Sequence, residues 1–389
     1  MRRLLGQIHL WSGLILCLPL VLIGLTGSIL VFQEEIDALA GGTPPARTSG
    51  EMQPVGAMIA AAEEAVANTA MNGSKAVAVT LPRAPGDPAI IRLAAPRAGS
   101  GGGPGGGGQI RLDPVTLSVL DIRQPGGSFM MILHRLHANL LIGSRDGRTV
   151  VGWLGLVMLA LGASGIVIWW PRNGRWREAF SVKWRARPLR FNRDLHGAVG
   201  IWGLAVFMVV SFSGVYLAFP QVITAGIGSV LPARDLRSQD ARLKAAPITG
   251  QVPIDIDQVV ALARQQEPSA VLRNIVLPAR KDQPYRLTLA QPARADGAPP
   301  ATLYIDPWSR QILANRNPAD YSLGESILAW QRPLHEGAGL GWIWRILVFC
   351  SGLLPLLFSI TGVTMWLLKQ RNRKNAANQQ KRAVAAVID

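Results

Sequence analysis

Cysteine and histidine are scarce in this sequence of 389 residues. Its two cysteines, Cys17 and Cys350, lie in separate apolar segments, so no disulfide between them is expected. No C-x-x-C-H motif occurs, so any haem would have to bind without a covalent link. A hydrolytic triad, a paired-carboxylate motif and a glycine loop that opens a helix are also lacking. These absences argue against hydrolytic and phosphate-binding chemistry.

Charged side chains are missing from four long apolar stretches, at 10–32, 149–171, 196–219 and 346–368. Each is long enough to cross a bilayer, which requires about 20 mainly apolar residues in a helix. The sequence therefore predicts an α-helical integral membrane protein with four transmembrane helices. A signal peptide cleaved after Ala40 is the weaker alternative. Three acidic residues, Glu34, Glu35 and Asp37, separate the apolar run from that position.

Basic residues orient these helices. They gather at Arg2 and Arg3, in the link from Arg172 to Arg193, and in the tail after Lys369. The positive-inside rule places these segments in the cytoplasm, which predicts a multi-pass protein of a bacterial inner membrane with both termini cytoplasmic. The two long loops then lie in the periplasm. Because the positive charge borders the spans, it suits anionic membrane lipids, and no nucleic-acid partner is expected.

The second half of the chain repeats the first. A shift of 187 positions superposes two sets of residues, His9, Gly13, Gly27 and Phe32 on His196, Gly200, Gly214 and Phe219. "QIRLDPVTLSVL" (109–120) also resembles "TLYIDPWSRQIL" (302–313), each with an Asp-Pro turn after a strand. This internal duplication predicts two small periplasmic α+β domains, each with one helix and a short antiparallel sheet. The glycine-rich run 99–108 is predicted to be a flexible hairpin or linker.

The apolar stretches and the repeat together divide the chain into segments. Transmembrane helices are predicted in 1–33, 134–171, 195–220 and 335–368. The periplasmic α+β domains are predicted in 34–133 and 221–334, the basic cytoplasmic loop in 172–194 and the cytoplasmic tail in 369–389.

All five histidines lie at the edge of a predicted span. His9 and His196 open the first and third spans, whereas His134, His137 and His335 precede the second and fourth. A single histidine at a membrane interface needs no function. The repeat, however, pairs His9 with His196 and His137 with His335, so that each membrane face receives two histidines from different helices. A six-coordinate haem requires one imidazole on each side of its iron.

These pairs predict two non-covalent haem b groups with bis-histidine ligands. His134 is an alternative to His137, because residues three apart on a helix share a face. His137 is preferred, since "LHANL" (136–140) resembles "LHEGAGL" (334–340). A mononuclear zinc site is the competing interpretation, but zinc usually takes three or four ligands.

Small and basic residues near the histidines fit a haem but do not require one. Close backbone approach to a flat porphyrin, or ordinary helix packing, explains Gly13 and Gly200 with the nearby Ser12 and Gly203. Propionate partners, or lipid headgroup contacts, explain Arg135, Arg193 and Arg345.

The sequence resembles the PepSY-associated transmembrane family over almost its whole length. The resemblance rests on "LH" at His9 and His196, on the stretch 136–170, on "TG" or "SG" at 26–27, 164–165 and 361–362, and on the strand-plus-"DP" pattern. In size and plan the chain is similar to inner-membrane ferric-siderophore reductases of the FoxB type. The resemblance implies an oxidoreductase that passes electrons through haem b to siderophore-bound iron(III) in the periplasm and so releases iron(II).

The same resemblance leaves the partners and alternatives open. Some relatives carry a flavin and nicotinamide reductase domain after the last helix, whereas this chain ends in a basic tail, so the electron donor is expected to be external, a quinol or a cytoplasmic reductase. The ferric siderophore is expected to dock in a cleft between the two periplasmic domains, with Trp308, Tyr321 and Trp330 as candidate contacts. The alternatives are a quinol-linked cytochrome with another periplasmic acceptor and a non-redox PepSY binding or regulatory protein.

Overall fold

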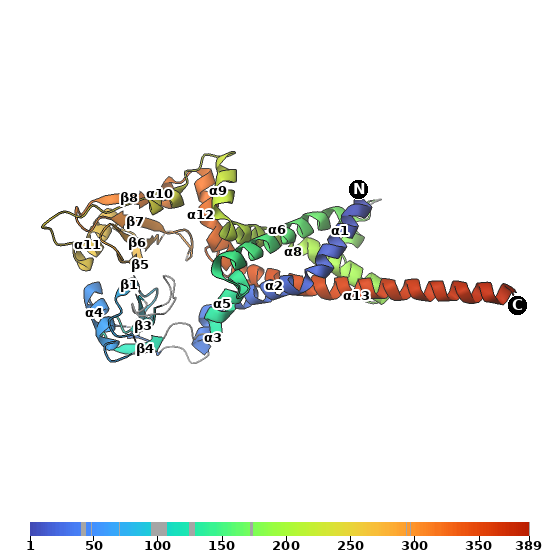
Figure 1. Ribbon diagram of the computed structural model, residues 1–389, viewed down its shortest axis with the longest axis horizontal. Coiled ribbons are helices and arrows are strands. Elements are labelled where there is room, and N and C mark those ends of the chain that lie inside the picture. Colours follow the sequence, from blue (N-terminus) through green and yellow to red (C-terminus); the bar gives the residue numbers. More distant parts are fainter. Residues whose placement is uncertain are drawn as a thin grey trace.

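A helical bundle and an antiparallel sheet lie end to end in the computed structural model (Figure 1). The structure describes residues 1–39, 44–47, 49–69, 71–94, 107–123, 129–171, 174–292, 294–295 and 297–388. Most of the glycine-rich run 99–108 therefore lies outside the described residues. The N-terminus and the end of the last helix both point away from the sheet.

The bundle consists of apolar helices of membrane-spanning length. Three described helices are long and apolar enough to cross a membrane, α6 (Ser144–Trp169), α8 (Pro188–Ala218) and α13 (Gly341–Ile388). A fourth span results if α1 (Arg2–Ile15) and α2 (Cys17–Val31) are counted together, although these two helices meet at an angle of 67°. The protein is therefore a membrane protein.

The first predicted span differs from the straight helix that its composition suggests. The helix breaks at Leu16, whose backbone has φ −99° and ψ 7°. Pro19 explains the position of the break, because proline has no N–H to donate and its ring clashes with the carbonyl four residues earlier, here that of Ile15. As a result α1, which carries His9, turns aside from the line of α2 and packs against α6.

Eight strands form one antiparallel sheet in the order β4-β3-β2-β1-β5-β6-β7-β8. Their bounds are β1 Ala76–Thr80, β2 Ala89–Leu93, β3 Gln109–Leu112, β4 Val119–Arg123, β5 Val271–Val276, β6 Tyr285–Ala290, β7 Ala301–Ile305 and β8 Ile312–Arg316. The two short sheets predicted from the repeat are thus joined, since β1 pairs with β5 at the register Val79 to Ile275. This pairing satisfies the backbone N–H and C=O groups that each four-stranded unit would otherwise expose at its edge.

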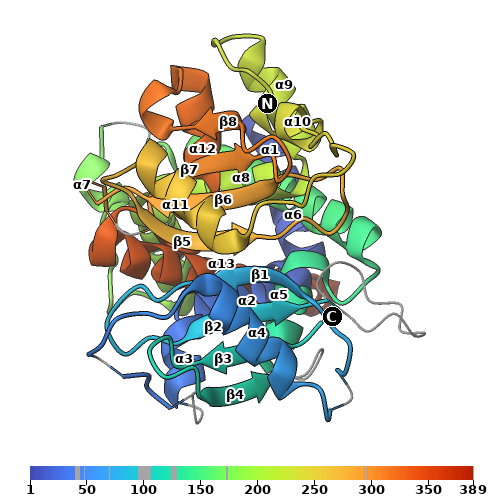
Figure 2. The same cartoon turned by 90° about the vertical axis from the view of Figure 1, so that its left-hand side faces the viewer.

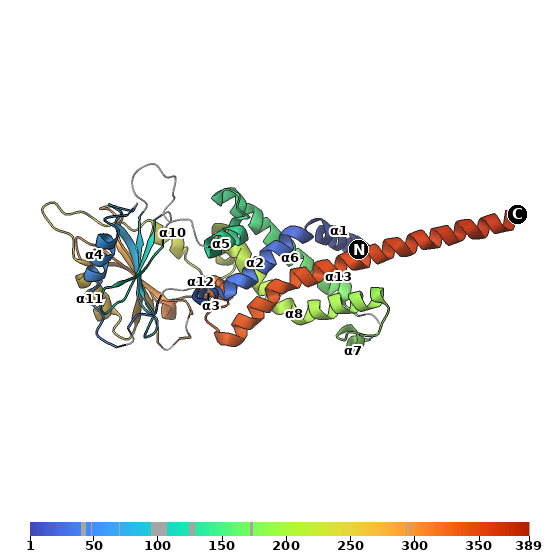
Figure 3. The same ribbon diagram turned by 90° about the horizontal axis from the view of Figure 1, so that it is seen from below.

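The helices α4 (Val55–Ala65) and α11 (Ile256–Gln266) cover the same face of the sheet, remote from the bundle (Figures 2 and 3). They enclose a continuous apolar core that includes Met58, Ala62, Ile91, Val259, Ala263, Ile275 and Leu303. Asp257 of α11 also accepts hydrogen bonds from the backbone N–H groups of Val55 and Gly56 at the start of α4. The two halves therefore share one core.

Short helices connect the sheet to the bundle. They are α3 Gln33–Leu39, α5 Phe129–Asn139, α9 Pro220–Gly228, α10 Leu236–Ala241, the 3-10 helix η1 Pro318–Asp320 and α12 Leu323–Glu336. A further short helix, α7 Trp176–Ala179, instead links α6 to α8 at the end of the bundle remote from the sheet (Figure 3). In the views of Figures 1 and 3, α5 and α12 lie between the sheet and the long helices. These two helices carry His137 and His335.

Candidate functional site

Four of the five histidines meet as two pairs. His9 on α1 and His196 on α8 form the distal pair, which lies far from the sheet and has ring centroids 6.3 Å apart. His137 on α5 and His335 on α12 form the proximal pair, with centroids 6.0 Å apart. Two imidazoles that bind one metal ion from opposite sides, with metal–nitrogen bonds of about 2.0 Å, have centroids about 6.3 Å apart. Both pairs match that spacing.

A hydroxyl group holds each ring of the distal pair. The Nδ1 atom of His9 lies 2.8 Å from Ser164 Oγ, and that of His196 lies 2.8 Å from Thr361 Oγ1. Each hydroxyl donates its own hydrogen to a backbone carbonyl of the preceding helical turn. The hydroxyl oxygen must then accept, so each imidazole donates from Nδ1.

The proximal rings are held in the same way, with one addition. His137 Nδ1 lies 3.2 Å from Thr26 Oγ1, and His335 Nδ1 lies 3.1 Å from Ser213 Oγ. Each Nδ1 also lies within hydrogen-bonding distance of the backbone carbonyl three residues before that hydroxyl, at 3.0 Å and 3.1 Å. Because a carbonyl oxygen can only accept, Nδ1 carries the hydrogen in both rings.

These contacts leave the second ring nitrogen, Nε2, as an acceptor or metal ligand. No hydrogen bond between Nε2 of these four rings and a described residue is formed. Metal-binding histidines commonly donate their other N–H to a carbonyl or another fixed acceptor, which orients the ring. Among the described residues no three His, Cys, Asp or Glu side chains gather as ligands, so the three or four ligands that zinc prefers do not occur there.

A glycine follows every one of the four hydroxyl residues. A Cβ atom added to Gly27 would lie 2.9 Å from His137 Cε1, and one added to Gly214 would lie 3.1 Å from His335 Cε1. The distal equivalents, Gly165 and Gly362, have more room, at 3.8 Å and 4.0 Å from the nearest histidine atom. The hydroxyl-glycine dipeptide therefore provides both an acceptor for the ring and space beside it.

Sequence reasoning missed the role of these hydroxyls. It used the dipeptides at 26–27, 164–165 and 361–362 as family markers and noted Gly214 only as part of the repeat. The signal that could have pointed to them is recurrence, since each of the four apolar stretches contains a Ser-Gly or Thr-Gly pair, and the first and fourth contain a second one, Ser12-Gly13 and Ser351-Gly352. These six pairs outnumber the four paired histidines, so recurrence alone does not tell which hydroxyls hold a ring.

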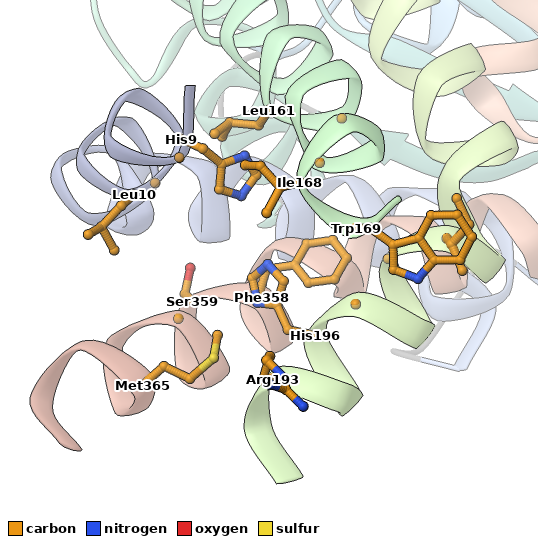
Figure 4. Close-up of a pocket in the computed structure, with 18 of the residues that line it drawn as sticks. His9, Leu10, Leu161, Ile168, Trp169, Arg193, His196, Phe358, Ser359 and Met365 are labelled. Atoms are coloured by element: carbon orange, nitrogen blue, oxygen red, sulfur yellow. The ribbon is translucent and has the colours of Figure 1, made fainter. Parts of the chain in front are cut away.

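A cavity of about 810 Å³ surrounds the distal pair. His9 and His196 project into it from separate helices, among apolar side chains that include Leu161, Phe358 and Met365 (Figure 4). The Phe358 ring lies 4.8 Å from the His196 ring. A volume of this size is typical of sites for cofactors and other organic ligands.

Glycines widen this cavity, and charged residues line part of it. Gly13 and Gly200 belong to the lining, whereas Ser12 and Gly203 do not. Gly203 instead packs against Leu354, where an added Cβ would lie 2.7 Å from the leucine side chain. The charged lining residues are Arg3, Arg190, Arg193, Lys369, Glu178 and Asp194.

The remaining predicted residues have other surroundings. His134 is exposed on α5, and it is His137 that faces His335. Arg135 is also exposed. Arg345 donates to the carbonyl of Val31 at 2.7 Å and forms an ion pair with Glu35, so it joins the start of α13 to the end of α2. Of the predicted propionate partners, Arg193 alone lines the distal cavity.

The three aromatic residues proposed as substrate contacts do not meet in one place. Tyr321 lines a second cavity, and the indole N–H of Trp308 donates to the carbonyl of Lys281 at 2.9 Å. Trp330 packs near Gly339. The two predicted domains are joined edge to edge, because β1 pairs with β5 in one continuous sheet, and docking of a ferric siderophore between them stays a prediction.

Fold and side chains together define a helical membrane protein with an attached antiparallel sheet and two pairs of facing histidine rings. The chain belongs to the PepSY-associated TM region family, whose model matches residues 7–369. It is similar to an uncharacterized protein of Pseudomonas aeruginosa, with 25% identity over 268 residues. That match covers 63% of this chain and 65% of the relative, so the chain spans somewhat less than two thirds of the relative's length.

Proposed function

We propose that this protein is a membrane cytochrome with two haem b groups, one between His9 and His196 and the other between His137 and His335. The observation that carries the proposal is the arrangement of each pair, in which two imidazoles face each other with Nδ1 hydrogen-bonded and with Nε2 bonded to no described residue. Haem held by two imidazoles would supply reversible one-electron transfer between iron(III) and iron(II).

The protein's own groups would position and shield this chemistry. Ser164 and Thr361 fix the distal rings, and Thr26 and Ser213 fix the proximal ones, so that ring rotation does not have to be frozen when a ligand binds. The apolar side chains of the distal cavity would contact the porphyrin, and Arg193, which pairs with Asp194 at 3.1 Å, would bind a propionate with its remaining N–H groups. The described residues thus fit a flat apolar ligand with an acidic edge.

The two sites lie at different depths of the bundle. His196 and Ser213, which holds His335, both belong to α8, and their separation along that helix corresponds to about 25 Å. The basic segments of the chain lie at the distal end of the bundle (Figure 1). The positive-inside rule then favours a cytoplasmic distal site, a periplasmic sheet and four spans arranged as a duplicated pair of halves.

We further propose that the periplasmic acceptor is iron(III) bound by a siderophore, and that an external quinol or cytoplasmic reductase supplies the electrons. Each electron would reduce one iron(III) to iron(II). Hydroxamate and catecholate oxygens hold iron(II) much more weakly than iron(III), so reduction itself releases the metal. No acid or nucleophile is needed for this step.

The test begins with the purified full-length protein. Its visible spectrum and haem content should show haem b at about two groups per chain. Protein reduced with dithionite should then be reoxidised by a ferric hydroxamate or catecholate siderophore, but not by the gallium(III) complex of the same siderophore, which has the same shape and is not reduced. A haem-free protein would overturn the cytochrome and favour a binding or regulatory role, while a reduced haem protein that no ferric chelate reoxidises would overturn the iron reductase.

A further inference from the structure

A second cavity, of about 490 Å³, lies against the second half of the sheet. Tyr304 and Arg286 reach it from β7 and β6. Their neighbours Leu303, Ile305 and Leu287 are buried in the core beneath α11, and side chains alternate between the two faces of a strand. Tyr304 and Arg286 therefore project from the opposite face, toward α10 and α12.

Tyrosine is concentrated here. Three of the four tyrosines in the chain line this cavity, Tyr216, Tyr304 and Tyr321. Burial raises the pKa of Tyr321 and, together with Asp240, raises that of Tyr304 to about 12. Both phenols therefore keep their hydrogens at neutral pH. Arg234, Arg237 and Arg286 add three guanidinium groups to the same lining.

The most buried carboxylate of the cavity is already paired. Glu325 accepts from Arg234 Nε at 2.6 Å and Nη2 at 3.1 Å, and also from the backbone N–H of Ser322. The side-chain hydrogen bond from Arg234 is the main reason that the pKa of Glu325 falls to about 2. Arg234 and Glu325 thus neutralise each other.

The two remaining carboxylates are also engaged. Asp240 accepts from Arg316 Nε at 2.8 Å and from the Tyr304 hydroxyl at 3.1 Å. Asp235 caps α10 and accepts from both the backbone N–H and the hydroxyl of Ser238.

Two guanidinium groups remain without a carboxylate partner. Neither Arg237, on α10, nor Arg286, on β6, forms an ion pair with a described acid. Arg286 contacts the Tyr304 hydroxyl, which occupies only part of its five N–H donors. The Tyr216 hydroxyl has no hydrogen-bond partner among the described residues. The cavity therefore offers positive charge and donors from several elements, without a free acid to oppose them.

We propose that this cavity binds a small organic anion with two or more carboxylate groups. Arg237 and Arg286 each bind one carboxylate, because the planar guanidinium fork matches the two oxygens of that group. Leu236, Leu328 and Ala329 form the apolar part of the wall. The site lies along α12 from His335, since Glu325 and His335 are separated by about 15 Å on that helix.

Citrate is a suitable probe for this proposal. Calorimetric titration of the purified full-length protein in detergent should show saturable binding of citrate. Arg237→Gln and Arg286→Gln should each weaken binding about tenfold or more, as expected for the loss of a charge-assisted hydrogen-bonded pair. Arg280→Gln is the matched control. Arg280 is exposed in the link between β5 and β6, pairs with Asp282 and lies outside the cavity, so its replacement should leave the affinity unchanged.

Several results would overturn the proposal. They are the absence of saturable citrate binding, equal affinity of the wild type and both cavity variants, and an equally strong response to sulfate, which lacks a second anionic group. Each variant should unfold at the same temperature as the wild type, which shows that its fold is intact. Citrate binding is measured irrespective of haem content, so a negative result leaves the proposed electron transfer standing, and a haem-free protein leaves this site standing.

Discussion

The imidazole rings of His137 and His335 lie 6.0 Å apart, although the two residues come from opposite halves of the chain. The distal rings of His9 and His196 repeat this relationship at the other end of the bundle. In both pairs the hydroxyl that holds a ring belongs to the same half of the chain as the histidine it holds. The pairs therefore exist only where the two halves meet.

Removal of one proximal ligand is the first test of the site. His335→Ala should lower the haem content from about two to about one per chain, because a single remaining imidazole leaves one axial position of the iron open. Haem is quantified against protein as the pyridine haemochrome. His134→Ala is the matched control, since His134 is exposed on α5 and should leave the content unchanged. Loss of one haem in His134→Ala as well as in His335→Ala would reverse the assignment between His134 and His137.

Removal of a hydroxyl acceptor should weaken haem binding more at the distal pair than at the proximal pair. His196 Nδ1 has Thr361 Oγ1 as its described acceptor, whereas His335 Nδ1 has both Ser213 Oγ and a backbone carbonyl. Thr361→Val should therefore weaken distal haem binding about 10- to 100-fold, the usual cost of losing such a partner, while Ser213→Ala should weaken proximal binding less.

Haem titration of the apoprotein, followed by absorbance, measures both effects. An equal loss of haem affinity in the two variants would show that the backbone carbonyl does not compensate for the missing hydroxyl at the proximal pair. No loss in Thr361→Val would show that the hydroxyl does not orient the ring.

The glycines give a steric prediction. Gly27→Ala places a methyl group 2.9 Å from His137 Cε1, so the ring must move from its two acceptors. We expect the proximal haem to be lost or its spectrum altered. Gly165→Ala is the matched control beside His9, where the same distance is 3.8 Å, an ordinary contact. Identical spectra for Gly27→Ala and the wild type would contradict the crowding at the proximal ring.

The histidine pairs and the apolar helices could be predicted from the sequence, but the hydroxyl groups that hold the histidine rings could not. A hydropathy pattern identifies membrane helices because crossing a bilayer requires about 20 mainly apolar residues. Motifs within these helices indicate the family. The internal repeat predicted the histidine pairs, because it aligned histidines, which are rare in this chain, at equivalent positions of the two halves. Which of the predicted ligands bind a cofactor stays a prediction.

Other features depend on contacts between distant segments, which a local pattern does not report. The pairing of β1 with β5 follows from two strand edges meeting in space. The break at Leu16 was within reach of the sequence, since Pro19 marks it, but the length of the apolar run concealed it. The second cavity joins Tyr216, Tyr304 and Tyr321, which no spacing rule relates.

The contact between helices α4 and α11, which come from different halves of the chain, can be weakened at Asp257. Its carboxylate caps α4, accepting from Val55 N at 2.7 Å, so Asp257→Ala should cost about 0.5–2 kcal/mol of stability. The melting temperature should fall by about 2–4 °C for each kcal/mol lost. Asp255→Ala is the control, because Asp255 stands at the N-terminus of α11 without a side-chain capping bond. Scanning fluorimetry compares them, and an equal melting temperature for both variants would contradict the cap.

Stability should depend on pH through Glu325. Its pKa falls from 4.5 to about 2 in the folded protein, mainly through the hydrogen bond from Arg234. A lowered pKa stabilises the fold above the unfolded value, and this contribution is lost as the pH falls from about 4.5 through about 2. The melting temperature of Glu325→Gln should therefore lie below that of the wild type at pH 7, and the difference should shrink toward pH 3.

Glu336→Gln serves as the control for Glu325. Glu336 forms an exposed ion pair with Arg332, a type that contributes little, so its loss should leave the melting temperature unchanged at both pH values. A difference for Glu325→Gln that does not vary with pH would show that the effect is one of packing rather than of charge.

Each histidine pair takes one residue from each half of the chain, and this has a consequence for assembly. One half of the chain contains one histidine and its hydroxyl acceptor at each end of the bundle, and therefore half of each site. Two such halves made as separate polypeptides would have to find each other before either site existed, and the pairing of β1 with β5 provides a template for that encounter. Cofactor uptake would then report the meeting of the halves, so an unassembled half would remain colourless.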